Sequence, residues 1–348
     1  MDIEITDKDY LKAKDVEYKT AHSDEFKRTL VKYKFLFDKV RAEMGKVVVG
    51  QDEIVNSLIE ALLCNGHVLV EGIPGIAKTL IIRTLSEIAG CQFSRIQFTP
   101  DLLPTDIIGI TTYEEGRGFY TVKGPIFANF VLADEINRAP PKVQSALLES
   151  MQERQVTIGK ESFKLPSPFF VMATQNPIES LGTYKLPEAQ IDRFLFKLMM
   201  TYPKVEDEVL ILHKNMTLRR FDEFNLKPIM GPEIILQAQN DIKKVYMDPK
   251  IENYLIRIVD STRNPKNYNV ELGKYIEYGA SPRSSIAMYI ASKAHALLKG
   301  KTYVSPMDVK EVAKDVLRHR IILNYEGQAE EIQQEHIVEE ILNKVPIV

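Results

Sequence analysis

The sequence predicts an α/β fold, in which a parallel sheet is covered on both faces by helices and is followed by a helical domain. Two observations support this prediction. From about residue 45 to residue 200, apolar segments typical of buried strands alternate with helical patterns. Beyond residue 201 the strand patterns stop and helical patterns continue. The predicted strands are His67–Val70, Gln92–Phe98, Phe130–Glu135, Phe169–Thr174 and Phe194–Met200.

The chain begins with two different segments. Residues 1–22 are charged and lack an apolar period, which predicts a flexible or loosely docked extension. A helix is predicted from Ser23 because apolar residues recur on one face. These residues are Leu30, Tyr33, Phe37 and Val40. The predicted domains are an extension with this helix over 1–40, an α/β core over 41–202, and a connector with a helical lid over 203–348.

The stretch Val70–Leu85, VEGIPGIAKTLIIRTL, nearly matches the phosphate-binding pattern G-x-x-x-x-G-K-[ST]. Such a loop presents backbone N–H groups to phosphates, its lysine reaches the outer phosphates, and its hydroxyl holds Mg²⁺. Lys78 and Thr79 supply the last two groups, at the start of a predicted helix over Lys78–Ala89. Because a predicted strand precedes the loop, this context favours a nucleotide site over a simple Gly-rich turn.

One position departs from that pattern, because Ala77 stands where the second glycine is usual. The residue before the lysine is expected to enter the helix already, and alanine keeps the N–H group and favours helical dihedral angles. Gly75 is therefore the predicted site of a positive φ. The alanine is predicted to be compatible with phosphate binding.

Two other predicted strands end in polar residues suited to nucleotide hydrolysis. Asp134 would hold Mg²⁺ through water, and Glu135 would orient or deprotonate the attacking water. A solvated strand end is the alternative, and it is less favoured in a chain that also carries the phosphate loop. Gln175 and Asn176 end another strand, where an amide could hold the attacking water, although an Asn-Pro turn explains the same residues.

Two shorter patterns complete the residue-level predictions. Residues 155–165 alternate as a hairpin. In the C-terminal region, Ser305 as N-cap, Pro306 at the first helical position and Asp308 at the third position predict the start of a helix.

Composition excludes several classes of protein. The chain has 348 residues, of which 45% are hydrophobic and 27% charged, and its net charge is −3. These values predict a soluble protein of two domains without a nucleic-acid surface. Cys64 and Cys91 cannot form a disulfide framework and lack metal-ligand spacing. No segment resembles a membrane span or a signal peptide, so a cytoplasmic location is expected.

Together the motifs resemble the MoxR family of AAA+ ATPases, from about Gly45 to Gly327. The resemblance is carried by EGIPGIAKT, QFTPDLLPTDIIG, GPIFANFVLADEINRAPPKVQSALLESMQE, ATQNPIE, LPEAQIDRFLFK, GASPRSS and VLRHRIILNYEG. It implies an AAA+ P-loop core with a five-stranded parallel sheet, an insertion in the second helix at about 101–125, a C-terminal all-α lid and a ring, usually a hexamer. Alanine before the lysine is usual in that family.

The resemblance also implies roles for single residues. Beside Glu135 as a catalytic residue, Asn176 would sense the γ-phosphate, Arg193 would be the arginine finger and Arg283 a second sensor. Without the resemblance, both arginines are better explained as ion-pair residues, Arg193 beside Asp192. The implied cofactors are ATP and Mg²⁺, with Mg²⁺ held by Thr79 and through water by Asp134. The implied nucleotide-binding residues are Val49, Gly50, Gln51, Gly72, Pro74, Gly75, Ile76, Ala77, Lys78, Thr79, Leu80, Asp134 and Arg283.

The implied function is ATP hydrolysis that drives chaperone-like remodelling, assembly or maturation of a protein partner. A partner with a von Willebrand factor A domain is implied by the resemblance alone. One alternative is the ATPase motor subunit of a magnesium or cobalt chelatase, which shares the insertion. A module that binds ATP without hydrolysis is disfavoured by Glu135, Asn176 and Arg193 together.

A DNA-translocating ring is a less favoured alternative, because the segment Asp101–Pro125 carries four acidic and two basic residues. Neither a nucleic-acid partner nor a membrane span is expected. The aromatic pair Phe119-Tyr120 in this segment could face a central pore. Packing of the pair on the core of its own hairpin is the favoured interpretation.

Overall fold

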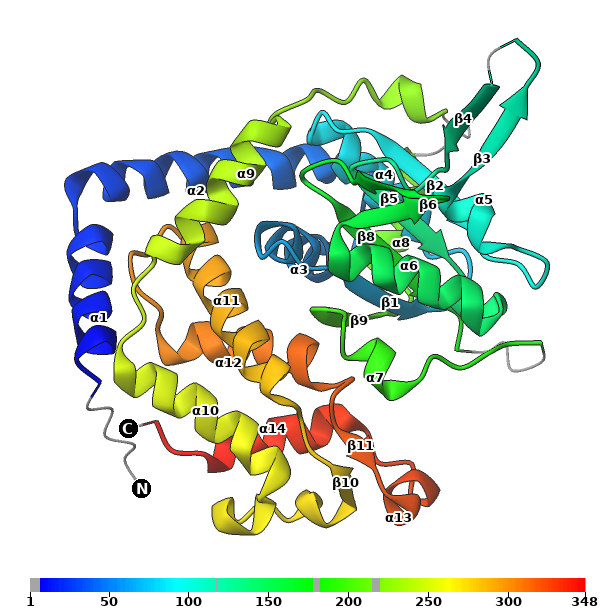
Figure 1. The fold of residues 1–348 in the computed structure, drawn as a ribbon. Coiled ribbons are helices and arrows are strands. Elements are labelled where there is room, and N and C mark those ends of the chain that lie inside the picture. Colours follow the sequence, from blue (N-terminus) through cyan, green and yellow to red (C-terminus); the bar gives the residue numbers. More distant parts are fainter. Residues whose placement is uncertain (1–6, 117, 178–181, 215–219, 348) are drawn as a thin grey trace. The chain divides into compact units, whose positions relative to one another are not determined.

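The computed structural model describes residues 7–116, 118–177, 182–214 and 220–347. The chain forms two compact units. An α/β unit comprises residues 38–236, and a mainly helical unit comprises residues 1–37 and 237–348. Figure 1 labels the elements of both units. The expected domain boundaries lay at residues 40 and 202. In the structure, residues 203–236 after the sheet belong to the α/β unit, and the N-terminal segment belongs to the helical unit.

Contacts within the α/β unit explain why the segment after the sheet belongs to it. The ammonium group of Lys214 donates to the backbone carbonyl of Gly45. The backbone N–H of Ile229 donates to the carbonyl of Ile88 at 2.8 Å. The chain thus returns to the α/β unit after its last strand instead of leaving it as a free connector.

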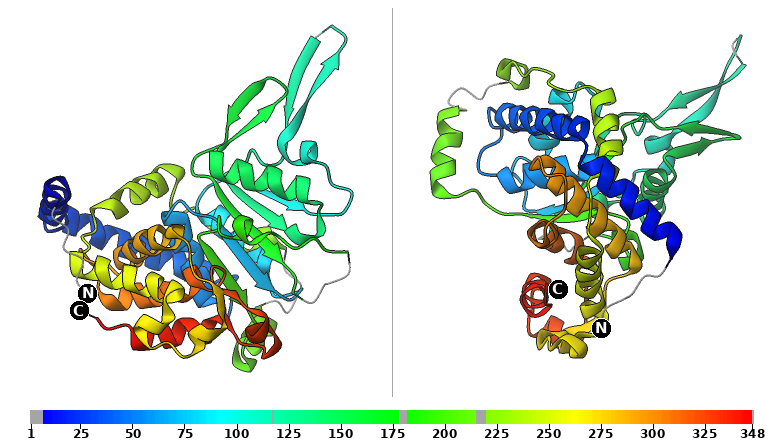
Figure 2. Two further views of the ribbon diagram at one scale, coloured as in Figure 1. Left: turned by 60° about the horizontal axis from the view of Figure 1, so that its bottom comes forward. Right: turned by 90° about the vertical axis from the view of Figure 1, so that its left-hand side faces the viewer.

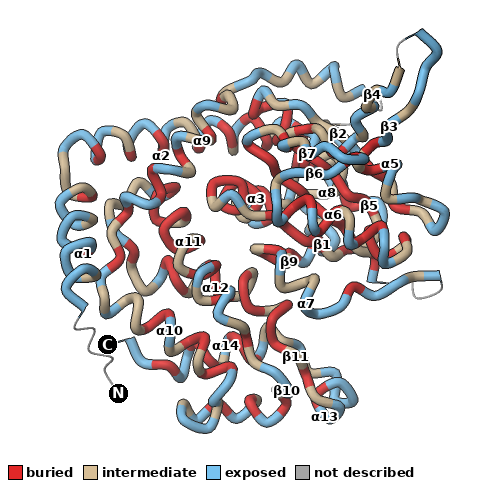
Figure 3. Tube along the Cα trace, in the orientation of Figure 1, coloured by how far each residue is buried: buried red, intermediate tan, exposed pale blue. Residues whose placement is uncertain are grey.

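The sheet has the strand order β2-β5-β8-β1-β9, and all neighbouring strands are parallel. Its strands are β1 (Val68–Gly72), β2 (Phe93–Gln97), β5 (Phe130–Asp134), β8 (Phe170–Gln175) and β9 (Phe196–Met200). The five-stranded parallel sheet expected from the sequence is confirmed. Figure 3 shows that the central strands are buried, as continuous apolar segments require in a sheet covered on both faces.

Helices pack on the two faces of this sheet. On one face, Ile96, Val131 and Ala173 of the strands form a buried cluster with Val143 and Leu147 of α6 (Pro141–Glu153). Helix α4 (Lys78–Ile88) contacts β2 and β5. The other elements of the unit are α3 (Asp52–Leu63), α5 (Pro104–Ile108), β3 (Gly109–Glu114), β4 (Gly118–Lys123), β6 (Gln155–Ile158), β7 (Glu161–Lys164), α7 (Glu188–Ile191), α8 (Val205–Lys214) and α9 (Pro232–Asp241), which crosses the unit boundary.

The two predicted hairpins of the unit are present, and one of them differs from expectation. Strands β6 and β7 pair antiparallel, as predicted for residues 155–165. Strands β3 and β4 form a ribbon that projects from the α/β unit in both views of Figure 2. Phe119 pairs with Tyr113 across this ribbon and is 79% exposed. The expectation that Phe119 packs on its own core is wrong, because a projecting two-stranded ribbon has no core to cover it.

Apolar helix faces build the helical unit. Tyr254, Ile258, Met288, Val312 and Ile337 are buried almost completely. Its elements are α1 (Lys8–Ala21), α2 (Asp24–Met44), which continues into the other unit, α10 (Pro249–Arg263), β10 (Ile276–Tyr278), α11 (Pro282–Leu298), α12 (Pro306–Leu317), β11 (Ile322–Leu323), α13 (Tyr325–Ala329) and α14 (Gln334–Lys344). None of the helices in the described part of the chain combines the length and the apolar character needed to cross a membrane.

Two local predictions for this unit have opposite outcomes. Helix α12 begins after a capping box formed by Ser305 and Asp308, as predicted. The expectation that no strand follows residue 201 is wrong, because β10 and β11 pair antiparallel. These strands have three and two residues, which is too short for an alternating pattern to be recognised in the sequence.

The N-terminal extension is a helix, and this corrects the sequence-based expectation for residues 7–22. Helix α1 is capped by Asp7, whose carboxylate accepts from the N–H of Asp9. Its Lys14 is only 9% exposed, and the ammonium group pairs with Glu252 of α10 at 2.5 Å. Lys293 of α11 reaches back to Glu17 at 2.5 Å. Because charged residues make these contacts, an apolar period could not reveal them.

His67, directly before β1, is buried and neutral. Its Nδ1 accepts from the N–H of Val171 at 3.1 Å, and its Nε2 lies 3.2 Å from the carbonyl oxygen of Met151, to which the protonated nitrogen donates. Burial, and then the charge of Arg154, lower the pKa of His67 to about 3. Below about pH 6.5, the ordinary pKa of histidine, His67 becomes protonated in the unfolded chain but stays neutral in the folded chain. Folding stability therefore falls as pH drops from about 6.5 towards 3.

We expect His67→Gln to flatten this acid dependence. When the pH is lowered from 7.5 to 5, protonation of His67 in the unfolded chain should reduce the unfolding free energy of the wild type by about 2 kcal/mol. His67→Gln should be less stable at pH 7.5, but it should lose about 2 kcal/mol less on acidification. Urea unfolding of both proteins at the two pH values measures the difference, in which the other titrating groups cancel. Equal losses in both proteins would contradict the assignment.

Candidate functional site

The predicted phosphate loop connects β1 to α4, and two of its residues have a positive φ. Gly75 has φ 84°, as predicted. Ala77 has φ 64° and ψ 22°, so it is left-handed and does not enter the helix. The expectation of helical angles at Ala77 is wrong, although alanine in this conformation costs only about 1–2 kcal/mol. A left-handed residue before the helix turns successive N–H groups towards one point, which suits an anion.

Two further contacts define the loop. The ammonium group of Lys78 donates to the carbonyl oxygen of Gly72 at 2.6 Å, so this lysine is held across the mouth of the loop. A Cβ atom at Gly72 would lie 2.7 Å from Cδ1 of Ile76 and 2.9 Å from the carbonyl oxygen of Met200. Glycine is therefore required at residue 72 so that the loop can pack against β9.

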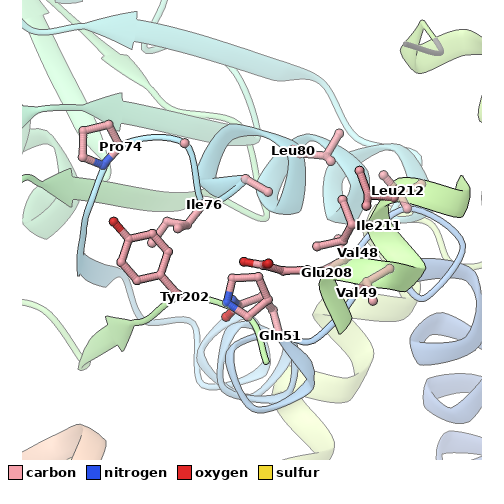
Figure 4. A pocket seen from close by; sticks show the side chains of 14 residues that line it. Val48, Val49, Gln51, Pro74, Ile76, Leu80, Tyr202, Glu208, Ile211 and Leu212 are labelled. Carbon is pink, nitrogen blue, oxygen red and sulfur yellow. The ribbon is translucent and has the colours of Figure 1, made fainter. Parts of the chain in front are cut away.

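A pocket of about 420 Å³ adjoins the loop (Figure 4). Seven of the residues predicted to bind the nucleotide line it: Val49, Gln51, Pro74, Gly75, Ile76, Ala77 and Leu80. Gly50 lies between two lining residues with φ 69°, and a Cβ atom there would lie 2.6 Å from Oδ2 of Asp207. The wall of the pocket is largely apolar, which suits the flat face of a nucleotide base.

The sequence-based prediction missed one wall of this pocket. Tyr202 and Pro203 follow β9, and Glu208, Ile211 and Leu212 come from α8. Figure 4 shows the Glu208 side chain among these residues. A signal existed, because Tyr202 lies two residues after the end of β9, and ligands bind at the carboxyl ends of strands in a parallel sheet.

The strand order brings Glu135 and Asn176, two of the predicted catalytic residues, to one edge of the sheet. Strand β8 lies between β1 and β5, so the loop, Asn176 and the Asp134-Glu135 pair follow three adjacent strands. Asp134 and Asn176 are 8% and 4% exposed. The local sequence could predict each strand end, but only the sheet order shows that they are neighbours.

Each carboxylate of the pair is held by an arginine. Arg95 on β2 contacts Oδ2 of Asp134 at 2.6 Å, and the Thr174 hydroxyl donates to Oδ1 at 2.7 Å. Arg138 donates to Oε2 of Glu135 at 2.9 Å. Gln97 also donates to Oε2 of Glu135, at 2.8 Å. Both carboxylates are thus fixed in place, and an approaching cation meets a positively charged neighbour at each.

The donor chemistry of this edge fits Mg²⁺ bound to a nucleotide. Thr79 supplies a hydroxyl and Asp134 a carboxylate, and both are oxygen ligands of the type that Mg²⁺ prefers. Among the described residues no group of three His, Cys, Asp or Glu side chains could hold a metal ion. A metal at a nucleotide needs only one or two protein ligands, because phosphates and water complete its shell.

The two predicted arginines lie in different units. Arg193 lies between α7 and β9 and is exposed. Among the described residues its side chain forms no ion pair. Arg283 is the second residue of α11 in the helical unit and is also exposed. The action of either arginine on a nucleotide stays a prediction.

Comparisons with known proteins cover nearly the whole chain. Residues 67–196 match the ATPase family associated with various cellular activities (AAA), and residues 273–341 match the AAA lid domain. Chaperone MoxR1 of Mycobacterium tuberculosis is 47% identical over 307 residues, which cover 88% of this chain and 80% of the relative. Protein MoxR of Paracoccus denitrificans is 32% identical over 314 residues, covering 84% and 91%. A solved structure from Cytophaga hutchinsonii has 47% identity and a TM-score of 0.86, covering 92% of this chain and 97% of that one.

Proposed function

Since the chain belongs to the MoxR family of AAA+ ATPases, we propose that it hydrolyses ATP with Mg²⁺ and uses the cycle to remodel, assemble or mature a protein partner. The observation that carries the proposal is the phosphate loop at an apolar pocket of about 420 Å³, on the same sheet edge as the Asp134-Glu135 pair. A base pocket, a phosphate cradle and a water-orienting carboxylate are the parts that nucleotide hydrolysis requires.

Different residues of the loop are proposed to bind different parts of the nucleotide. The N–H groups around Gly75 and Ala77 receive the phosphates, and the ammonium group of Lys78 exchanges the Gly72 carbonyl for a phosphate oxygen. Thr79 and Asp134 would hold Mg²⁺, which would neutralise charge on the phosphates. The apolar walls exclude water from the base.

The catalytic step depends on residues at the edge of the sheet. Glu135 accepts a proton from the attacking water or orients it, and Asn176, directly after the neighbouring strand β8, holds the same water against the γ-phosphate. Arg193 from a second copy of the chain stabilises the charge of the transition state. Arg283 responds to the nucleotide from the helical unit.

Family membership supports two proposals, one on the assembly and one on the partner. We infer a ring, usually of six copies, in the cytoplasm, and a partner that carries a von Willebrand factor A domain. The chelatase motor remains the second candidate, and a pull-down with the chelatase large subunit against one with a von Willebrand factor A protein separates the two.

Lys78→Ala tests nucleotide binding. We expect it to abolish ATP binding in a calorimetric titration, because the loop loses the ammonium group that is proposed to reach the outer phosphates. Lys142→Ala, an exposed lysine of α6, is the matched control and should bind as the wild type does. Wild-type affinity in Lys78→Ala would remove the loop from the site.

A further inference from the structure

Arg95 makes a two-donor contact with the carboxylate proposed to hold Mg²⁺. Its Nε and Nη2 donate to Oδ2 of Asp134 at 3.2 and 2.6 Å. The Asp134 side chain is 12% exposed and the Arg95 side chain 49% exposed. Arg95 is thus the more accessible partner of a nearly buried carboxylate.

Strand register places this arginine. Gln97 of β2 lies opposite Asp134 of β5, and Arg95 lies two residues earlier on β2. Side chains two residues apart point to the same face of a strand, so Arg95, Gln97 and Asp134 share one face of the sheet. Arg95 also donates to Oε1 of Gln97 at 2.7 Å, which holds the guanidinium above the carboxylate.

The contacts of Asp134 leave little room for a second cation. A carboxylate offers about four lone-pair sites. Two donors of Arg95 occupy Oδ2, and the Thr174 hydroxyl occupies one site of Oδ1. A water molecule bound to Mg²⁺ would donate to the same carboxylate, and a guanidinium beside a divalent cation would add electrostatic repulsion.

We propose that Arg95 is a positioning residue that neutralises Asp134 in the absence of metal and is displaced when Mg²⁺ arrives with the nucleotide. The proposal rests on the proposed function, because it takes Asp134 as the residue that holds Mg²⁺. Arg95 compensates the buried charge of Asp134 whenever no metal is bound, and competition with Arg95 raises the Mg²⁺ concentration that nucleotide binding requires.

The test measures binding, so it is independent of turnover. The probe is a fluorescent methylanthraniloyl ADP, titrated with wild type and variants at a series of Mg²⁺ concentrations. Arg95→Gln should lower the Mg²⁺ concentration at half-maximal binding by about three- to tenfold, because the competitor is removed. Arg95→Lys keeps the charge but not the two-donor contact, and should lie between wild type and Arg95→Gln.

Arg138→Gln is the matched control. It removes an equal charge from the same pair of carboxylates, but Arg138 contacts Glu135 and not Asp134. A general change in the electrostatic field would lower the Mg²⁺ concentration at half-maximal binding equally in both variants. Direct competition by Arg95 predicts that this concentration changes less than about twofold in Arg138→Gln. Equal shifts in Arg95→Gln and Arg138→Gln would overturn the proposal.

Other outcomes also decide the question. An unchanged or higher Mg²⁺ requirement in Arg95→Gln would mean that Arg95 only supports Asp134 structurally. If thermal melting shows that Arg95→Gln does not fold, the same titration is made with Arg95→Lys. An unchanged Mg²⁺ concentration at half-maximal binding in that variant overturns the inference. Failure of the wild type to bind the probe at any Mg²⁺ concentration would instead remove the proposed nucleotide site itself.

Discussion

Glu135→Gln should bind ATP with nearly wild-type affinity and hydrolyse it about 10²- to 10⁴-fold more slowly. The side chain is proposed to act on the attacking water and not on the phosphates, so its loss affects the chemical step alone. Glutamine keeps the shape of the residue and can still contact Gln97. Calorimetric binding and phosphate release under saturating ATP measure the two effects separately.

Glu149→Gln, an exposed position of α6, is the control for the loss of one carboxylate. It should retain wild-type turnover. If turnover by Glu135→Gln equals that of the wild type, Glu135 has no part in the mechanism. If binding is lost together with turnover, Glu135 is a binding residue, and the proposed division between the loop and the carboxylate is wrong.

Arg193→Ala should leave ATP binding nearly intact and reduce hydrolysis, by as much as about 10³- to 10⁵-fold if it acts as an arginine supplied by a neighbouring subunit. A cation aimed at the γ-phosphate stabilises charge that develops only during phosphoryl transfer. Arg193 is exposed and unpaired within the described chain, so its removal breaks no ion pair there. Arg28→Ala, another exposed arginine, is the matched control and should retain activity.

Mixing two inactive variants tests whether the site is shared. Arg193→Ala subunits keep Glu135, and Glu135→Gln subunits keep Arg193, so a mixed ring contains interfaces with both groups. The mixture should regain part of the wild-type hydrolysis. Absence of recovery despite demonstrated co-assembly, or wild-type activity that persists unchanged in a monomer, contradicts the shared site.

Local sequence was sufficient for the parts of the protein whose structure depends on neighbouring residues. The central strands β5 and β8 are short segments that begin with a continuous apolar run, and they are buried along nearly their whole length. The loop from Gly72 to Thr79 is recognisable because glycine, lysine and hydroxyl must occur at fixed spacing. The helix start at Ser305 is equally local, since its capping box spans four residues.

Other features depend on residues that are distant in the sequence. Helix α1 contacts the rest of the helical unit through Lys14 and Glu17, whose partners lie more than 200 residues away, and charged residues carry no apolar period. Phe119 is exposed because its ribbon projects. Ala77 is left-handed although alanine by itself favours helical angles, because the loop between β1 and α4 requires the turn.

The sequence by itself determined the sheet strands, the phosphate loop and the carboxylate pair, because each is encoded by a short pattern of residue types. Only the tertiary structure decided which of these groups meet. Sheet order places β2 beside β5, so Arg95 reaches Asp134 across about 40 positions of sequence. The return of α8 supplies Glu208, Ile211 and Leu212 to the pocket. Such contacts arise from packing of distant segments, and no local pattern specifies them.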